Sequence, residues 1–274
     1  MRFRFVFSVV VLSLLYPSWV FSAAEKDFEN LYGQLLRTYW HPQVSIHGVK
    51  TTVFDYKSMA VDAKKEISIF NKIDDALEKI DLTLLGREDS VKAFWINVYN
   101  YAAMRLVIKN YPVDSIRSLK ISLLKYPWAI KSVRVGSELY SLKKIEKEML
   151  LEPFLDNRIV FAVSCAAVSC PDRIIEPFTA ENINDQLDRM IRTFFSNNKK
   201  GLYYDKTKQI LTLSWILEKD EALFSNAGGV LEFVKGYVDP DTLLFLTASS
   251  VTVRFFDHDW TLNDLDQSDN EKKS

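Results

Sequence analysis

The only two cysteines of the 274-residue chain, Cys165 and Cys170, follow a short apolar run with four residues between them. In an exported protein, such a pair favours a disulfide. Closing so short a loop contributes about 2 kcal/mol and requires the two Cα atoms to come within roughly 7 Å. The alternative is that Cys170 is a nucleophile activated by a base. Metal binding is discounted, because two cysteines with no histidine nearby in the sequence are too few ligands for a closed zinc site.

A thiolate nucleophile needs a general base, and the best-placed candidate is His258. This histidine follows a predicted strand and is flanked by Asp257 and Asp259, which would orient its ring as the third member of a triad does. The alternative is a surface cluster of histidine and acids on a terminal loop. The other two histidines, His41 and His47, lie beside a turn, and we interpret them as surface residues.

Two asparagines lie in an unusual helical segment. Residues 91–111 carry apolar side chains all round, which predicts a central, buried helix. Asn97 and Asn100 are three positions apart and share a face of it. A buried amide costs about 1–3 kcal/mol if it stays unpaired, so both should have partners. They either fix neighbouring backbone, or one of them points its amide at a substrate or an oxyanion.

The cysteines must be positioned by the run before them. Residues 159–165 are small or apolar on both faces, which predicts a central strand buried on both sides. Pro171 cannot continue a ladder, so the chain should turn away there. Periodicity predicts the other elements. Helices are expected at residues 25–40, 58–85, 141–151, 179–197, 231–237 and 239–246, with Thr179 capping the fourth; a strand or extended arm at 44–56; hairpins at 133–140 and 203–213; and a last strand at 251–256.

These elements define the fold class as α+β, with a helical N-terminal half packed on a small, mostly antiparallel sheet. We expect a single domain over residues 24–264, followed by a frayed polar tail at 265–274. Hydrophobic residues make up 48% of the chain, enough for a sizeable core. The formal net charge of −1 offers no basic excess for nucleic acid.

The N-terminus predicts the compartment. Arg2 and Arg4 precede an apolar run at residues 6–15, and small residues follow at 22–24, so residues 1–23 are expected to be a signal peptide. An uncleaved anchor is the alternative, since residues 5–24 are just long enough to span a bilayer. We expect a periplasmic or secreted protein with no stable membrane span after signal removal.

Four ordered motifs resemble a known family. They are AFWINVYN at residues 93–100, SLKKIE at 141–146, DNRIVFAVSCAAVSCP at 156–171 and HDWTLND at 258–264. Together they are similar to the domain-of-unknown-function 547 family over roughly residues 50–264. The resemblance implies an exported bacterial member, since exported bacterial proteins and plants carry this domain. It brings no reaction, cofactor or partner with it.

The resemblance adds one candidate residue and shows three departures. Glu146 matches the glutamate of the family pattern, and the family's histidine after it is Lys147 here. The arginine expected shortly afterwards is Leu151. His258 stands where the family usually has tyrosine. If the family's histidine is a base, this chain has lost it, and His258 is either a replacement or a coincidence.

The leading hypothesis is a cysteine-dependent hydrolase or acyl transferase that uses no cofactor or metal. The alternative is a non-catalytic periplasmic binding or scaffold module stapled by a Cys165–Cys170 disulfide. A thiol-redox role is weaker, because the usual redox motif has two residues between its cysteines. The candidate catalytic residues are Cys170 as nucleophile, His258 as base, Asp259 or Asp257 as its orienting acid, Asn97 or Asn100 as a polar stabiliser, and Glu146.

Overall fold

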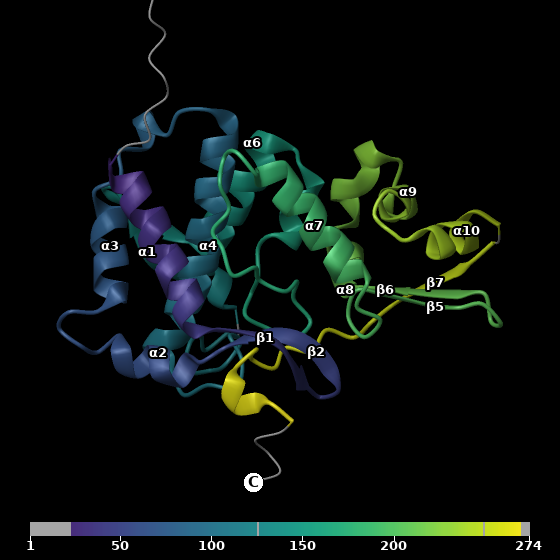
Figure 1. The fold of residues 1–274 in the computed structure, drawn as a ribbon, viewed down its shortest axis with the longest axis horizontal. Coiled ribbons are helices and arrows are strands. Elements are labelled where there is room, and N and C mark those ends of the chain that lie inside the picture. Colours follow the sequence, from purple (N-terminus) through teal and green to yellow (C-terminus); the bar gives the residue numbers. More distant parts are fainter. Residues whose placement is uncertain (1–22, 125, 249, 270–274) are drawn as a thin grey trace, which may run out of the picture.

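A computed structural model describes residues 23–124, 126–248 and 250–269 (Figure 1). The predicted signal peptide lies outside the described residues, apart from its last position. The structure is a mixture of helices and small sheets, which confirms the α+β class. Helices α1, α3 and α4 stand together in one half, and a sheet of β5, β6 and β7 extends from the other half (Figure 1).

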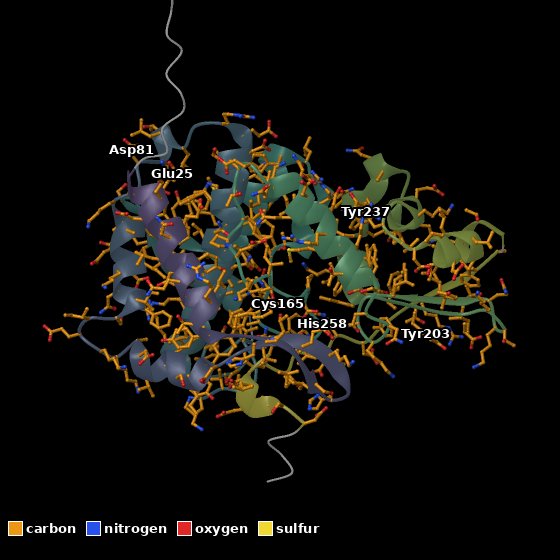
Figure 2. All side chains as sticks on the ribbon, in the orientation of Figure 1. Glu25, Asp81, Cys165, Tyr203, Tyr237 and His258 are labelled. Atoms are coloured by element: carbon orange, nitrogen blue, oxygen red, sulfur yellow. A yellow bond between two sulfur atoms is a disulfide. The ribbon has the colours of Figure 1, made fainter. Side chains whose placement is uncertain are left out.

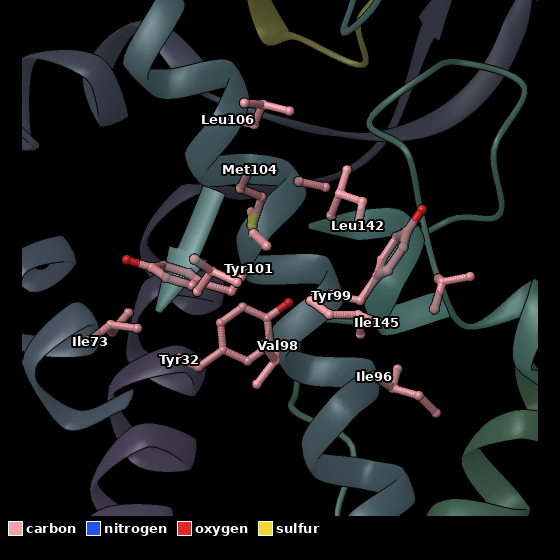
Figure 3. Packing of buried hydrophobic residues seen from close by; sticks show 14 of the residues in the cluster. Tyr32, Ile73, Ile96, Val98, Tyr99, Tyr101, Met104, Leu106, Leu142 and Ile145 are labelled. Carbon is pink, nitrogen blue, oxygen red and sulfur yellow. The ribbon is translucent and has the colours of Figure 1, made fainter. Parts of the chain in front are cut away.

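The centre of the helical half is α4 (Glu88–Asn110), whose side chains are almost all buried. It contacts α1 (Ala23–Tyr39) and α2 (Tyr56–Asp62), and α3 (Ile69–Glu78) packs against α1. Figure 3 shows side chains leaving α4 on several sides and meeting neighbours on each of them. The prediction of a central buried helix is therefore confirmed, because a helix that is apolar all round has no face to present to water.

The single helix predicted over residues 58–85 is wrong. The chain forms α2 and then α3, with a turn between them and a short 3-10 turn, η1 (Leu82–Leu84), afterwards. The second helix starts where Ser68 Oγ accepts a hydrogen bond from the backbone N–H of Asn71 at 3.1 Å. A serine cap of this kind marks the start of a new helix, so α3 begins here as a helix separate from α2.

The strands form three small sheets. The first pairs β1 (Trp40–Ile46) with β2 (Val49–Phe54), and the second pairs β3 (Lys131–Val135) with β4 (Glu138–Ser141). In the third, β6 (Ile210–Leu213) lies between β5 (Leu202–Asp205) and β7 (Thr252–Phe255). All pairs are antiparallel except β6 with β7. Both predicted hairpins are confirmed, and the segment predicted as one arm at 44–56 belongs to a third.

The predicted central strand at residues 159–165 is wrong. Residues Asn157–Phe161 form a 3-10 helix, η4, and an irregular loop carries both cysteines after it. The turn starts where the Asp156 carboxylate accepts from the backbone N–H of Arg158 at 3.1 Å. A short apolar run buried on every side fits a strand and a buried turn equally well, because alternation cannot separate the two.

The longest of the remaining helical elements is α7 (Ile183–Phe195). It starts four residues after Thr179, whose hydroxyl accepts from Asn182 instead of capping the helix as predicted. The others are η2 (Pro127–Ala129), α5 (Leu142–Lys144), the π-helical turn η3 (Ile145–Leu151), α6 (Glu152–Phe154), α8 (Trp215–Lys219), η5 (Glu221–Ala227), α9 (Val230–Lys235), α10 (Pro240–Ala248) and η6 (Leu265–Gln267). Within the described part of the chain, no helix is both long and apolar enough to cross a bilayer.

The end of the chain is fastened as far as residue 269, in contrast to the frayed tail expected from its polarity. The Asp269 carboxylate accepts from the Ser45 hydroxyl at 2.6 Å and from the backbone N–H groups of His47 and Gly48 at 3.0 and 3.1 Å. This carboxylate therefore closes the β1–β2 turn, and C-terminal residues contribute to the first sheet.

Two hydrophobic cores meet at η4. Ile159 belongs to the core of the helical half, and Phe161 belongs to the core that α7 forms with the third sheet. The loop that follows η4 is therefore anchored on both sides. A side chain that leaves this loop toward solvent emerges at the junction of the two halves.

Candidate functional site

A cavity of about 550 Å³ opens at this junction. Its wall includes both cysteines, and Figure 2 shows Cys165 close to His258 near the middle of the molecule. Aromatic rings and charged groups share the rest of the wall. The lining residues are Tyr99, Arg117, Tyr126, Trp128, Lys143, Glu146, Val160, Val163, Cys165, Cys170, Trp215, Ile216, Lys219, Asp220, Asp257, His258 and Trp260.

The two cysteines form a disulfide, with Cα atoms 6.4 Å apart. This confirms the pairing that their spacing favours. Cys170 is 3% exposed, and Cys165 is more exposed than its partner. Both cysteines line the cavity, and Cys165 is the more accessible end of the bond.

The asparagines of α4 hold the backbone around this loop. The Asn100 amide donates to the carbonyl of Ala162 at 2.8 Å and accepts from the N–H of Ser164 at 2.9 Å. Asn97 makes the same pair of bonds with the backbone of Phe178. Both predicted asparagines have partners, as expected. Neither lines the cavity, so the geometry gives them a structural role and does not support contact with a substrate.

A buried ion pair behind the loop escaped the sequence analysis. The Lys200 ammonium group is fully buried and lies 2.8 Å from the Asp172 carboxylate. It also donates to the carbonyls of Val168 and Cys170 at 3.2 and 3.0 Å. Burial lowers the pKa of Lys200, and Asp172 opposes that shift. A lysine in a polar turn is normally predicted to be exposed to solvent. The sequence around Lys200 therefore gives no indication that this residue is buried.

His258 faces the disulfide. A ring nitrogen of His258 and the two sulfurs all lie within 4.8 Å of one another. The ring packs against Trp260 and Trp215, with centroids 4.1 and 5.0 Å away. Neither ring nitrogen has a hydrogen-bond partner in the described part of the chain. Burial lowers the pKa of His258 to about 4 against the opposing charge of Asp259, so the ring is neutral at pH 7 and can accept a proton.

The acids flanking His258 do not orient it. The Asp259 carboxylate accepts from the backbone N–H of Thr261 and pairs with Nδ1 of His47, both at 2.9 Å. Asp257 lies on the cavity wall and is exposed. The triad expected from adjacency in the sequence is therefore a pair of sulfur and histidine, because neighbouring side chains on an extended segment point in different directions.

Glu146 reaches the cavity on its other side. Lys219 Nζ lies 3.7 Å from Glu146 and 3.3 Å from Asp220, so one ammonium group bridges two carboxylates. Burial raises the pKa of Glu146, Lys219 opposes the shift, and Asp220 adds to it. Lys147, at the position of the family's histidine, is exposed and pairs with Glu152 at 3.7 Å. The position of that histidine therefore lies on the surface in this chain.

The fold and the site define an α+β protein with an aromatic cavity, which a disulfide and a histidine line. The ring nitrogens of this histidine accept or donate no hydrogen bond within the described residues. Residues 84–195 match the model of the family described as "Protein of unknown function, DUF547". Comparisons with curated proteins and with solved structures gave no match. The matched segment holds Glu146 and both cysteines, whereas His258 lies beyond it.

Proposed function

We propose that this protein is a cysteine-dependent hydrolase or acyl transferase whose nucleophile, Cys170, is released when the Cys165–Cys170 disulfide is reduced. The observation that carries the proposal is the close approach of His258 to both sulfurs at the wall of a cavity. A thiol at this position has a neutral imidazole within reach and an enclosed space for a substrate. Those are the requirements of a thiol nucleophile and its general base.

The nucleophile forms by thiol–disulfide exchange with a dithiol reductant. One reductant thiolate attacks Sγ of Cys165, the more exposed sulfur, and Cys170 leaves as a thiolate. The second thiol of the reductant then displaces Cys165 and completes its own disulfide. Two electrons and two protons pass from the reductant to the protein, which ends with two thiols.

The acyl transfer uses the two groups that face each other. His258 takes the proton of the Cys170 thiol as the sulfur attacks the carbonyl carbon of an ester or amide. The tetrahedral intermediate collapses to a thioester, and the leaving alcohol or amine takes the proton from His258. Water, or an acceptor alcohol or amine, then attacks the thioester while His258 accepts its proton. The acyl product leaves, and the proton returns to the sulfur of Cys170.

The cavity wall indicates the class of substrate. Three tryptophans line the cavity. Trp215 and Trp260 contact the His258 ring, and Trp128 packs edge to face on Trp260 with centroids 5.6 Å apart. Arg117 lies over the Trp260 ring at 4.7 Å and adds a positive charge beside it. An acyl compound with an aromatic or other flat apolar body and an anionic group fits these surroundings.

The proposal includes export to the periplasm or the exterior. The basic and apolar pattern of residues 1–23 supports it, and so does the disulfide, since disulfides persist in oxidising compartments. In such a compartment, a dedicated reductant, and not the general thiol pool, would reduce the disulfide and free Cys170. N-terminal sequencing of the protein recovered from the periplasm of an expressing bacterium tests this part, with a start near residue 24 as the expected result.

The experiment that tests the activity measures hydrolysis of 4-nitrophenyl esters of aromatic acids by oxidised and reduced protein, with a metal chelator present. We expect turnover only after reduction. Cys170→Ser should abolish it, and removal of the base by His258→Gln should lower it by about 10²–10⁴-fold. The matched variant Cys165→Ser should be active without any reductant, because nothing then blocks Cys170. Equal rates for Cys170→Ser and the reduced natural chain would contradict the proposal.

A second candidate is a non-catalytic binding module, and the closed disulfide is the observation that favours it. In that case the cavity binds an aromatic anion and the bond is a permanent staple. Quenching of tryptophan fluorescence by benzoate-type ligands would then be the same for the natural chain and for a Cys165→Ser/Cys170→Ser variant. Ester turnover would be absent from both.

A further inference from the structure

We propose that the reduced protein binds one zinc ion through the thiolates of Cys165 and Cys170 and the imidazole of His258. The three potential ligand atoms lie within 4.8 Å of one another, although His258 is far from the cysteines in the sequence. Along the sequence, the two cysteines have no histidine nearby. Folding supplies the third ligand from the segment after β7.

The geometry fits after a small displacement. In a tetrahedral zinc site the ligand atoms are about 3.6–3.8 Å apart, because zinc lies about 2.3 Å from sulfur and about 2.0–2.1 Å from nitrogen. The two Cα atoms are already 6.4 Å apart, so the sulfurs can separate to that distance by side-chain rotation. The histidine ring is held between Trp215 and Trp260, which keeps a ring nitrogen near the sulfurs.

An independent observation points to a missing partner. Both ring nitrogens of His258 are buried and make no hydrogen bond within the described residues. A buried polar atom without a partner normally costs free energy, so each such atom needs an explanation. A metal ion would supply a partner for one of the two nitrogens.

The ligand set selects the metal and the kind of site. Two thiolates and an imidazole favour zinc over magnesium or calcium, which prefer oxygen ligands. Three protein ligands leave the fourth position of a tetrahedral ion open, as in catalytic rather than structural zinc sites. The three ligand residues lie on the wall of the cavity, where Glu146, Asp220 and Asp257 supply negative charge and Arg117, Lys143 and Lys219 supply positive charge.

The oxidation state of the sulfurs controls this site. A dithiol reductant gives two electrons and two protons to the disulfide and becomes a disulfide itself. Zinc then replaces the two thiol protons, which pass to solvent, and binds both thiolates. A disulfide cannot supply thiolate ligands, so the oxidised protein should lack the site. The zinc site and the proposed function both require the disulfide to open, and they share nothing else. Zinc bound here would occupy Cys170 and block its attack on an ester.

The test uses cobalt and zinc alone, with no substrate. The full chain is reduced with a phosphine under argon and titrated with Co²⁺, and thiolate-to-cobalt charge transfer in the near ultraviolet is recorded. We expect saturation at one ion per chain and displacement of cobalt by one equivalent of zinc. His258→Gln and Cys165→Ser should each weaken binding by at least about 100-fold, since even outer partners of metal ligands contribute about 10–100-fold.

The matched control is His41→Gln, which removes a histidine of β1 outside the cavity and should bind cobalt like the natural chain. Circular dichroism of each variant verifies the fold. Equal cobalt affinity of the oxidised and reduced proteins, or an unchanged spectrum and affinity in His258→Gln, would overturn the inference. Cobalt binding without ester turnover would support the metal site and contradict the proposed function, and the reverse result would do the opposite.

Discussion

The backbone N–H of Ser164 donates to the side-chain Oδ1 of Asn100 at 2.9 Å, directly before the first cysteine. The same amide donates to the carbonyl of Ala162 at 2.8 Å. One side chain of the central helix therefore pairs with the Ala162 carbonyl and the Ser164 N–H, on the two sides of residue 163. The loop follows an irregular path that offers these groups no ladder partner, so α4 sets the position of the disulfide.

Truncation of this amide should destabilise the protein. Asn100→Ala leaves a buried N–H and a buried carbonyl unpaired, at about 1–3 kcal/mol for each. The midpoint of urea unfolding should fall accordingly. The control Asn198→Ala removes an exposed amide and should change the free energy of unfolding by less than about 0.5 kcal/mol. Equal midpoints for Asn100→Ala and the natural chain would show that the loop does not depend on α4.

Lys200 supports the same loop from the opposite side. In Lys200→Met the Asp172 carboxylate loses its buried counter-ion, and the carbonyls of Val168 and Cys170 lose a donor. Breaking a buried ion pair by removing one partner costs about 3–5 kcal/mol. The neighbouring Lys199 is exposed, so Lys199→Met is a matched control that should leave stability nearly unchanged. Thermal unfolding followed by circular dichroism measures both, and a similar effect of the two variants would contradict the burial of Lys200.

The disulfide itself predicts a measurable stabilisation. Reduction should lower the free energy of unfolding by about 2 kcal/mol, the loop-entropy value for so short a ring. Intact mass should rise by two hydrogens, and both cysteines should become reactive to a thiol reagent only afterwards. A Cys165→Ser/Cys170→Ser variant should match the reduced protein in stability. Labelling of either cysteine before reduction would contradict the bond.

Much of the fold could be predicted from the sequence, because its signals are local. The all-round apolar pattern at residues 91–111 predicts a helix buried at the centre, and the turns of the hairpins follow from short alternating runs. The run at 159–165 was misread, because small apolar residues suit any buried backbone and its hydrogen bonds go to Asn100, a partner that periodicity cannot show.

The candidate site was predictable only in part, for similar reasons. The cysteines and His258 stand out because their residue types are rare in this chain. The three residues lie together on the wall of the cavity. The orienting acid was misassigned, because adjacency in sequence does not give the direction of a side chain, and Asp259 turns to His47. Lys200 was missed because its burial depends on a loop contributed by a distant segment.

Asp264 gives a pH dependence that can be separated from all other groups. This residue is 2% exposed, and its carboxylate accepts from the Tyr111 hydroxyl at 2.9 Å. Burial raises its pKa to about 6, with Asp266 adding to the shift and the hydrogen bond from Tyr111 opposing it. In an unfolded chain the pKa of an aspartate is about 3.9.

Between these values the folded protein holds a proton that the unfolded chain has lost. Stability therefore falls as pH rises from about 4 to above 6, because the unfolded state binds fewer protons than the folded state. Asp264→Asn still accepts from Tyr111 and carries no charge. We expect the variant to equal the natural chain near pH 4 and to exceed it at pH 7, by on the order of 2 kcal/mol, since one pKa unit corresponds to about 1.4 kcal/mol.

The measurement is urea unfolding of both proteins at pH 4, 5, 6 and 7, with the difference in unfolding free energy plotted against pH. Effects of other titrating groups cancel in that difference. Asp185→Asn, at an exposed position in the first turn of α7, is the control for the loss of a surface carboxylate. A difference for Asp264→Asn that stays constant across this range would mean that Asp264 is ionised in the folded protein at every pH tested, with its charge satisfied by Tyr111 and the neighbouring backbone.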